Sequence, residues 1–185
     1  MKTIYFVTSN KGKLIEAKEK LSAINIEVVQ RNIGYPEVQV DTLEEVAHFG
    51  VEDVQKRFYQ PFILEDAGLF IDVLNGFSGV YSSYVFRTIG CKGILKLLEN
   101  IDKRKAVFRS VIAYKEPKKD PMFFVGECRG RIFTKELGKH GFGFDPIFIP
   151  DGETKTFAQM EVREKNRLSH RARSLEKLMD FFKKQ

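Results

Sequence analysis

The chain has 185 residues, and its 43% hydrophobic content with 17 phenylalanines argues against disorder and for one folded domain spanning residues 1–185. Its net charge of +6 comes from 31 Lys and Arg against 25 Asp and Glu, and because most bases alternate with acids it is weak support for nucleic-acid binding. The sequence contains neither an apolar run long enough to span a bilayer nor a secretory signal, so we expect a cytosolic protein.

Residues 3–7 are β-branched and aromatic and predict a first strand. A polar loop follows, after which Leu14, Ala17 and Leu21 recur at helical spacing, with Asn10 as a candidate N-cap. The unpaired N–H groups of that helix start, with Lys11 or Lys13, favour a bound phosphate. An ordinary capped helix with lysines in solvent is the simpler interpretation of this segment by itself.

Residues 26–29 predict a second strand, and Pro36 restricts the backbone before Glu37. That carboxylate is therefore either held at a defined place or part of a surface turn. Thr42 and Glu45 form a capping box for a second helix. Its expected buried face consists of Leu43, Val46, Ala47, Gly50, Val51, Val54 and Phe58.

The stretch from residue 62 to 68 is the centre of the interpretation. Three apolar residues predict a short buried strand that ends at Glu65 and Asp66, and the chain is expected to turn at Gly68 into another strand over residues 69–74. Ligands of open α/β sheets collect at the carboxyl ends of strands, so the two acids could hold a metal ion or activate water. A hydrated acidic turn is the alternative.

The next segments predict further helices and a hairpin. A glycine-rich loop over residues 75–84 leads into a helix, and residues 91–98 form another. Residues 106–114 and 122–133 predict long antiparallel strands with one wetted face, joined by the turn residues 116–121. Cys91 and Cys128 have no metal-ligand spacing, so we expect buried free thiols.

Two stretches near the end carry unusual side chains. Gly141 and Gly143 bracket Phe142, so Phe142 and Phe144 are either aimed into a cleft, where they could stack on a planar base, or buried in the core. Residues 166–183 predict a helix whose first turns are rich in donors, a possible anion or carbonyl site. A solvated basic helix start is disfavoured, because positive charge there opposes the helix dipole.

Four of these stretches, taken together and in order, resemble the Ham1/inosine triphosphatase family of nucleoside triphosphate pyrophosphatases. They are Thr8-Ser9-Asn10-Lys11-Gly12-Lys13, Leu64-Glu65-Asp66-Ala67-Gly68-Leu69, Phe142-Gly143-Phe144-Asp145-Pro146 and Lys165-Asn166-Arg167-Leu168-Ser169-His170-Arg171. The resemblance implies an elongated α/β fold in which a long mixed β-sheet with flanking helices forms two lobes around a central cleft. It also implies hydrolysis of ITP, dITP and XTP to the monophosphate and pyrophosphate with Mg²⁺, and usually a homodimer. From the sequence itself we expect binding to neither a membrane nor a specific nucleic acid.

Site roles follow from the resemblance residue by residue. Thr8, Ser9, Asn10 and Lys13 would hold the triphosphate. Glu37, Glu65 and Asp66 would position Mg²⁺, with Asp66 also the base that orients or deprotonates water. The base pocket would consist of Phe142, Gly143, Phe144, Asp145, Lys165, Ser169, His170 and Arg171. Donors such as His170 or Arg171 would pair with the 6-keto oxygen of hypoxanthine or xanthine and leave adenine unmatched.

One departure from the family pattern stands out: Gly50 occupies the place where the family has a phosphate-binding lysine, so Lys56 or another cation replaces it or the contact is missing. Two other functions remain open on the sequence. One is a related pyrophosphatase for other modified nucleotides, and the other is a basic nucleic-acid-binding domain. The sequence also leaves open how guanine, which shares the 6-keto group, is rejected, and how many metal ions bind.

Overall fold

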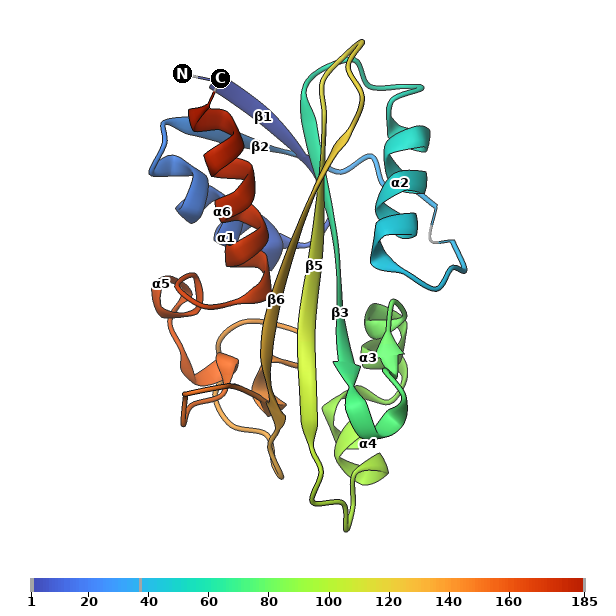
Figure 1. The fold of residues 1–185 in the computed structure, drawn as a ribbon, viewed down its shortest axis with the longest axis vertical. Coiled ribbons are helices and arrows are strands. Elements are labelled where there is room, and N and C mark those ends of the chain that lie inside the picture. Colours follow the sequence, from blue (N-terminus) through green and yellow to red (C-terminus); the bar gives the residue numbers. More distant parts are fainter. Residues whose placement is uncertain (1, 37, 185) are drawn as a thin grey trace.

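The computed structural model describes residues 2–36 and 38–184 and shows an elongated molecule built on one long sheet (Figure 1). The strands are β1 (Lys2–Val7), β2 (Ile26–Arg31), β3 (Phe62–Ile71), β4 (Ser78–Gly79), β5 (Lys105–Lys115), β6 (Met122–Ile132) and β7 (Phe148–Pro150). The helices are α1 (Lys11–Ser22), α2 (Leu43–Val54), α3 (Ser82–Thr88), α4 (Gly90–Leu97), α5 (Val162–Lys165) and α6 (His170–Lys183). Short 3-10 turns cover Asp72–Leu74, Asp145–Ile147 and Phe157–Gln159.

The sheet is mixed, as the family resemblance implies. Its order is β2-β1-β3-β5-β6-β7, with β4 pairing β3 outside this path. β1 runs parallel to both β2 and β3, whereas β3, β5, β6 and β7 are successively antiparallel. The predicted hairpin of two long strands is confirmed as β5 and β6, which give the molecule its length.

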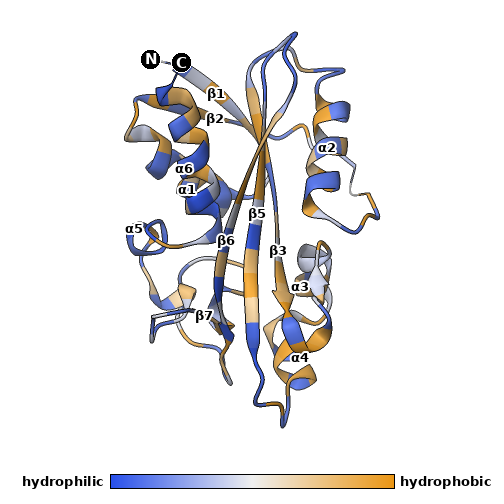
Figure 2. Ribbon diagram, viewed as in Figure 1, coloured by the Kyte–Doolittle hydropathy of each residue, from blue (hydrophilic) through white to orange (hydrophobic). Residues whose placement is uncertain are grey.

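Helices cover both faces of the upper sheet, and each face has its own core. On one face α1 and α6 pack against Ile63 and Ile112, and on the other α2 packs against Leu64 and Val111. A third cluster, around Phe108, fills the lower half, where it contacts α4 and the segment carrying β7. Figure 2 shows apolar residues concentrated on β3, β5 and α4. Side chains of consecutive strand residues thus enter opposite layers.

The central strand differs from its prediction. β3 runs without a break for ten residues, so Glu65 and Asp66 lie in its middle and not at its end, and the expected turn at Gly68 is wrong. The reason is long-range pairing: every residue from Phe62 to Ile71 has a partner on β5. This continuous ladder overrides the local signal of two acids and a glycine.

Capping signals correctly predict the starts of two helices. Asn10 caps α1, and Thr42 with Glu45 forms the capping box of α2, as predicted. α2 ends at Val54, so Phe58 lies beyond it, although its ring still packs against Tyr5. The single helix predicted over residues 166–183 is wrong at its start, because α6 begins only at His170 after a turn that follows α5.

Two further observations concern the cysteines and the lengths of the helices. Cys91 and Cys128 are buried free thiols, as predicted. Within residues 2–36 and 38–184, no helix is both long and apolar enough to cross a membrane.

Candidate functional site

The loop between β1 and α1 is a compact, internally bonded turn. The backbone N–H of Asn10 donates to Oγ1 of Thr8 at 3.1 Å, and the N–H of Lys13 donates to Oδ1 of Asn10 at 3.1 Å. Ser9 lies between them and is exposed. These bonds fix the first turn of α1, whose remaining N–H groups and positive dipole end suit an anion.

Lys13 joins this loop to β3. Its ammonium donates to the main-chain oxygen of Glu65 at 2.8 Å and lies 2.8 Å from Oε2 of the same residue, within ion-pair distance. The lysine is therefore anchored beside the central strand.

Glu65 is buried and surrounded by donors. Oε1 accepts hydrogen bonds from Oγ of Ser110 at 2.7 Å and from Nε of Arg171 at 3.1 Å. Burial would raise the pKa of Glu65, but Arg171 and Lys13 outweigh it and hold that pKa well below its usual range. Because both oxygens face cations, this carboxylate does not fit the predicted role of metal ligand.

Asp66 lies on the opposite side of the sheet from Glu65. Adjacent strand residues alternate, and the register that pairs Asp66 with Val111 places it on the α2 face. Asp66 is partly exposed and has its own interactions there. The expectation that both acids face one hollow is therefore wrong: Glu65 faces Lys13 and Arg171, and Asp66 does not.

The edge of β3 changes partner beside these acids. β3 pairs with β1 through Phe62 and Ile63 and with β4 through Leu69 and Phe70, so residues 64–68 lie between the two pairings. A ligand at this part of the edge would touch the Glu65 side and the Asp66 side of the sheet together. Separation of the two acids is thus compatible with one bound molecule.

The glycine-bracketed loop presents one aromatic ring, not two. Phe142 is partly exposed and packs on α1 where Gly12 has no side chain, since a Cβ there would lie 2.4 Å from its ring. Phe144 is buried in the lower core and meets Phe86 edge-on at 5.3 Å. Of the two outcomes that the sequence left open, Phe144 therefore follows the core and cannot stack on a base in this arrangement.

The cations predicted for the base pocket do lie together. Two cations lie near the ring of Phe142: Nζ of Lys165 is 5.0 Å and the guanidinium carbon of Arg171 is 5.2 Å from the ring centre. Asp145 accepts from Lys165 at 2.6 Å and from the Phe142 N–H at 2.8 Å. The loop, Lys165 and the start of α6 are thereby held as one unit.

Glu16 is a site residue that the sequence interpretation missed. It is buried, and its carboxylate lies 2.8 Å from Lys165 and 2.5 Å from Arg171. Burial opposes its ionisation, yet Arg171 and Lys165 lower the pKa of Glu16. An acid beside Ala17 on the buried face of α1, one turn after Lys13, was the available signal.

Ser169 and His170 have different tasks at the start of α6. Oγ of Ser169 caps the helix by accepting from the Ala172 N–H at 3.1 Å. His170 stacks on Phe108 with ring centres 4.6 Å apart, and among the described residues its Nδ1 has no hydrogen-bond partner. Burial and the neighbouring Arg171 lower the pKa of His170 well below its usual value, so its ring is neutral.

Some predicted contacts fall outside this cluster. Glu37, a predicted metal ligand, lies outside the described residues. Within the described ranges, no group of three His, Cys, Asp or Glu side chains is placed to hold a metal ion. A Cβ at Gly50 would meet Leu64 and Tyr35 at 3.0 and 3.1 Å, so a lysine has no room there, and Lys56 is exposed beyond α2.

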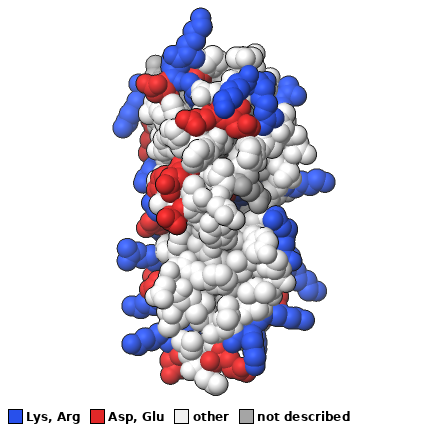
Figure 3. Space-filling model, turned by 90° about the vertical axis from the view of Figure 1, so that its right-hand side faces the viewer, with Lys and Arg blue, Asp and Glu red and all other residues white. Residues whose placement is uncertain are grey.

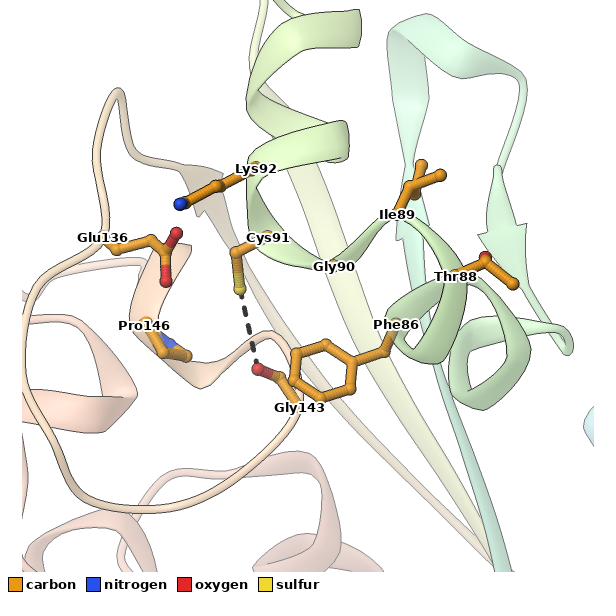
Figure 4. Close-up of a pocket in the computed structure, with 9 residues that line it drawn as sticks. All are labelled: Phe86, Thr88, Ile89, Gly90, Cys91, Lys92, Glu136, Gly143 and Pro146. Atoms are coloured by element: carbon orange, nitrogen blue, oxygen red, sulfur yellow. Dashed lines mark hydrogen bonds between the residues drawn. The ribbon is translucent and has the colours of Figure 1, made fainter.

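A separate cavity of about 360 Å³ is lined by residues of α3, α4 and the glycine-bracketed loop (Figure 4). Phe86, Cys91 and Pro146 line it, and Sγ of Cys91 lies 3.7 Å from the Gly143 oxygen that it contacts. Of the predicted site residues that the structure describes, only Gly143 borders this cavity. The charged cluster around Glu65 is therefore distinct from it.

Three features meet at one edge of the sheet. They are the start of α1, which suits a phosphate, the Phe142 ring beside two cations, and β3 with an acid on each face. Together with the mixed sheet, they define the class as a nucleotide-binding α/β protein. The chain belongs to the Ham1 family, whose family model matches residues 4–181.

Similar proteins cover nearly the whole chain. The chain is 51% identical over 180 residues to a "dITP/XTP pyrophosphatase" of Methanopyrus kandleri, covering 97% of this chain and 96% of that protein. It is 51% identical over 178 residues to a "dITP/XTP pyrophosphatase" of Thermococcus kodakarensis, covering 96% of each. A HAM1 protein from Coxiella burnetii superposes with a TM-score of 0.87 at 30% identity, covering 100% of both chains.

Proposed function

We propose that the protein hydrolyses the non-standard purine nucleotides ITP, dITP and XTP to the monophosphate and pyrophosphate, and so removes deaminated purines from the nucleotide pool. The observation that carries the proposal is the convergence of Lys13 and Arg171 on the buried carboxylate of Glu65, with the Phe142 ring beside Arg171. The names of these two relatives, and their similarity over 96% or more of this chain, support the same reaction class.

In the proposed reaction, the oxygen of a water molecule attacks the α-phosphorus, the bond to the bridging oxygen of the β-phosphate breaks, and pyrophosphate departs. Asp66 orients the water and accepts its proton, which then passes to solvent. The first turn of α1 and Lys13 bind phosphate oxygens and oppose the negative charge of the transition state.

Magnesium is part of the proposal. Asp66 offers a partly exposed carboxylate, and Mg²⁺ is commonly bound by one or two carboxylates, waters and substrate phosphates, so Asp66 would hold it while Glu65 would not. When bound, the ion would supply neutralisation of phosphate charge. Glu37 stays a predicted second ligand.

Base selection is assigned to Phe142 and His170. The Phe142 ring would stack on the purine, and the neutral His170, as its Nδ1–H tautomer, would donate to the 6-keto oxygen. An adenine amino group would leave that donor unmatched. Lys165 and Arg171, which are bound to Glu16 and other acids, position the pocket and do not pair directly with the base.

The test is incubation with ITP and Mg²⁺ followed by identification of the products. IMP and pyrophosphate are expected; IDP with orthophosphate, or no turnover, would overturn the proposal. Comparing ITP, XTP, GTP, dTTP and a methylated pyrimidine triphosphate at equal concentration separates this activity from that of a pyrophosphatase for other modified nucleotides.

Nucleic-acid binding is the weaker alternative. On the face shown in Figure 3, basic and acidic side chains are scattered with uncharged surface between them, and they form no continuous basic tract there. Salt-dependent DNA or RNA binding without any nucleotide hydrolysis would favour that alternative.

Assembly and location are also proposals. We propose a homodimer that acts in the cytoplasm, where the nucleotide pool is used by polymerases. Light scattering after size-exclusion chromatography should give twice the 21.4 kDa chain mass. A mass equal to one chain at micromolar concentration would contradict the dimer.

A further inference from the structure

A cluster of three charged residues on the Asp66 side of the sheet is not used by the site described above. Arg109 on β5 donates from Nη2 to Oε1 of Glu44 on α2 at 2.5 Å, and its Nε lies 3.2 Å from Oε1 of Glu127 on β6. The cluster joins three elements close to the proposed reaction centre. We propose that Arg109 binds the β- and γ-phosphates of the substrate and the pyrophosphate that leaves, an inference that rests on the proposed function.

The register of the sheet places Arg109 near Asp66. Asp66 pairs with Val111, and Gly68 pairs with Arg109, so Arg109 and Asp66 project from the same face. They are diagonal neighbours, whose backbones are typically about 7–8 Å apart, a distance that a long arginine side chain spans. Lys13, by contrast, contacts Glu65 on the other face.

The geometry of the reaction favours that separation. In-line attack puts the water and the leaving pyrophosphate on opposite sides of the α-phosphorus. A cation for the leaving group must therefore lie several ångströms from the carboxylate that orients the water. Arg109 meets this condition, since it lies one strand across and two residue pairs along from Asp66.

The present partners of Arg109 leave its hydrogen-bonding capacity underused. Two buried atoms of the cluster, Nε of Arg109 and Oε2 of Glu44, have no hydrogen-bond partner among the described residues. Nε of Arg109 does lie 3.2 Å from Glu127, within ion-pair distance. The side chains of Glu44 and Glu127 are 38% and 45% exposed, so the pairs that they form are weak and exchangeable. A phosphate offers the planar guanidinium a stronger, two-pronged partner.

Neighbouring features cannot take this task. The N-terminus of α2 is closed by its own capping box, with Thr42 and Glu45 bonded to each other, and Glu44 adds negative charge there. Gly50 is packed against Tyr35 and Leu64 and offers no cation. Arg109 is thus the described cation that links α2 with β5 on this face.

The experiment measures steady-state hydrolysis of ITP with Mg²⁺ and product inhibition by pyrophosphate and by IMP. For Arg109→Ala we expect KM for ITP and the inhibition constant of pyrophosphate each to rise about tenfold, as for loss of a charged hydrogen bond. The inhibition constant of IMP, which lacks those phosphates, stays unchanged. Arg109→Lys, which keeps the charge but not the planar fork, should give intermediate values.

Lys119→Ala is the matched control, because it removes an ion pair with Glu116 from the same hairpin, at the turn. It should leave KM and both inhibition constants unchanged. Two results would overturn the proposal and leave Arg109 with only a structural role between α2 and the hairpin. In one, Arg109→Ala leaves inhibition by pyrophosphate unchanged; in the other, it weakens inhibition by IMP and by pyrophosphate equally and also lowers thermal stability. Absence of ITP hydrolysis by the unmodified protein would instead refute the proposed function.

Discussion

Asp66 is the side chain whose removal should separate catalysis from binding. Asp66→Asn keeps the size of the side chain but cannot accept the proton of the attacking water. We expect kcat for ITP to fall by about 100- to 1,000-fold and the affinity for pyrophosphate to fall much less, because the amide oxygen of asparagine can still coordinate Mg²⁺. Pyrophosphate release and pyrophosphate inhibition measure the two quantities, and a variant with unchanged kcat would exclude Asp66 as the base.

His170 gives the protein a pH-dependent stability of definite sign. Its folded-state pKa is lowered, so the unfolded chain takes up the proton first as pH falls. Stability from the neutral ring is complete above the unfolded value of about 6.5 and is lost progressively below it, by at most about 1.4 kcal/mol per pH unit.

Urea unfolding between pH 8 and pH 5 measures this slope. His170→Gln should flatten the slope below about pH 6.5. His48→Gln, which removes an exposed histidine of α2, serves as the control and should retain it. A slope that persists in His170→Gln would show that another group takes up the proton.

At the scale of elements, the contact between α1 and the loop carrying Phe142 can be tested at Gly12. Alanine inside a helix normally stabilises it by about 0.5–1 kcal/mol relative to glycine. Here the new Cβ would lie 2.4 Å from the Phe142 ring, so the ring must move. We expect Gly12→Ala to raise KM for ITP and to fail to increase the melting temperature.

The double variant Gly12→Ala with Phe142→Ala isolates the clash. Removing the ring should restore the stabilising effect of alanine on α1, while KM stays high because the stacking surface is gone. Equal KM values for Gly12→Ala and the unmodified protein would mean that Phe142 does not form a wall of the base pocket.

Local patterns were sufficient for the elements that local interactions determine. Asn10 and the Thr42–Glu45 box marked the starts of α1 and α2, and the turn residues between β5 and β6 marked the hairpin. β3 was misjudged because its continuity through Glu65, Asp66 and Gly68 comes from pairing with β5, some 40 residues away, and not from its own composition.

The site was predicted in content but not in arrangement. Residue types indicated Lys13, Lys165 and Arg171 as cations, and they do lie close together. Their partners could not be deduced: Glu16 resembles any helix acid until the fold brings α6 beside it. Likewise, the sequence does not show that Phe144 is buried in the core while Phe142 stays partly exposed, because that depends on which side of the loop faces the core.

At the scale of the whole molecule, Glu16 links segments about 150 residues apart in the chain. It joins α1 to Lys165 and Arg171 within a buried set of charges. Glu16→Gln removes one of the carboxylates that balance Lys165 and Arg171, so the buried set is left with an uncompensated positive charge although Asp145 and Glu65 still contact these cations. We expect this change to lower the free energy of unfolding by about 3–5 kcal/mol.

Glu176→Gln is the matched comparison for this prediction. It removes an ion pair with Lys20 that joins the same two helices at the surface, where Glu176 is 50% exposed. A loss of at most about 1 kcal/mol is expected there. Denaturant titrations of both variants decide the matter, and equal losses would mean that the buried set contributes no more than a surface pair.

The two-sided chemistry of β3 also constrains how the gene can change. Deleting or inserting one residue ahead of Glu65 would move every later side chain of the strand to the opposite face of the sheet. The Asp66 carboxylate would then enter the layer that contains Lys13 and Arg171, and apolar side chains would enter the wrong core. Length variation in relatives should therefore concentrate in the β5–β6 turn and other loops. In β3, the number of residues that separate the part paired with β1 from the two acids should stay constant.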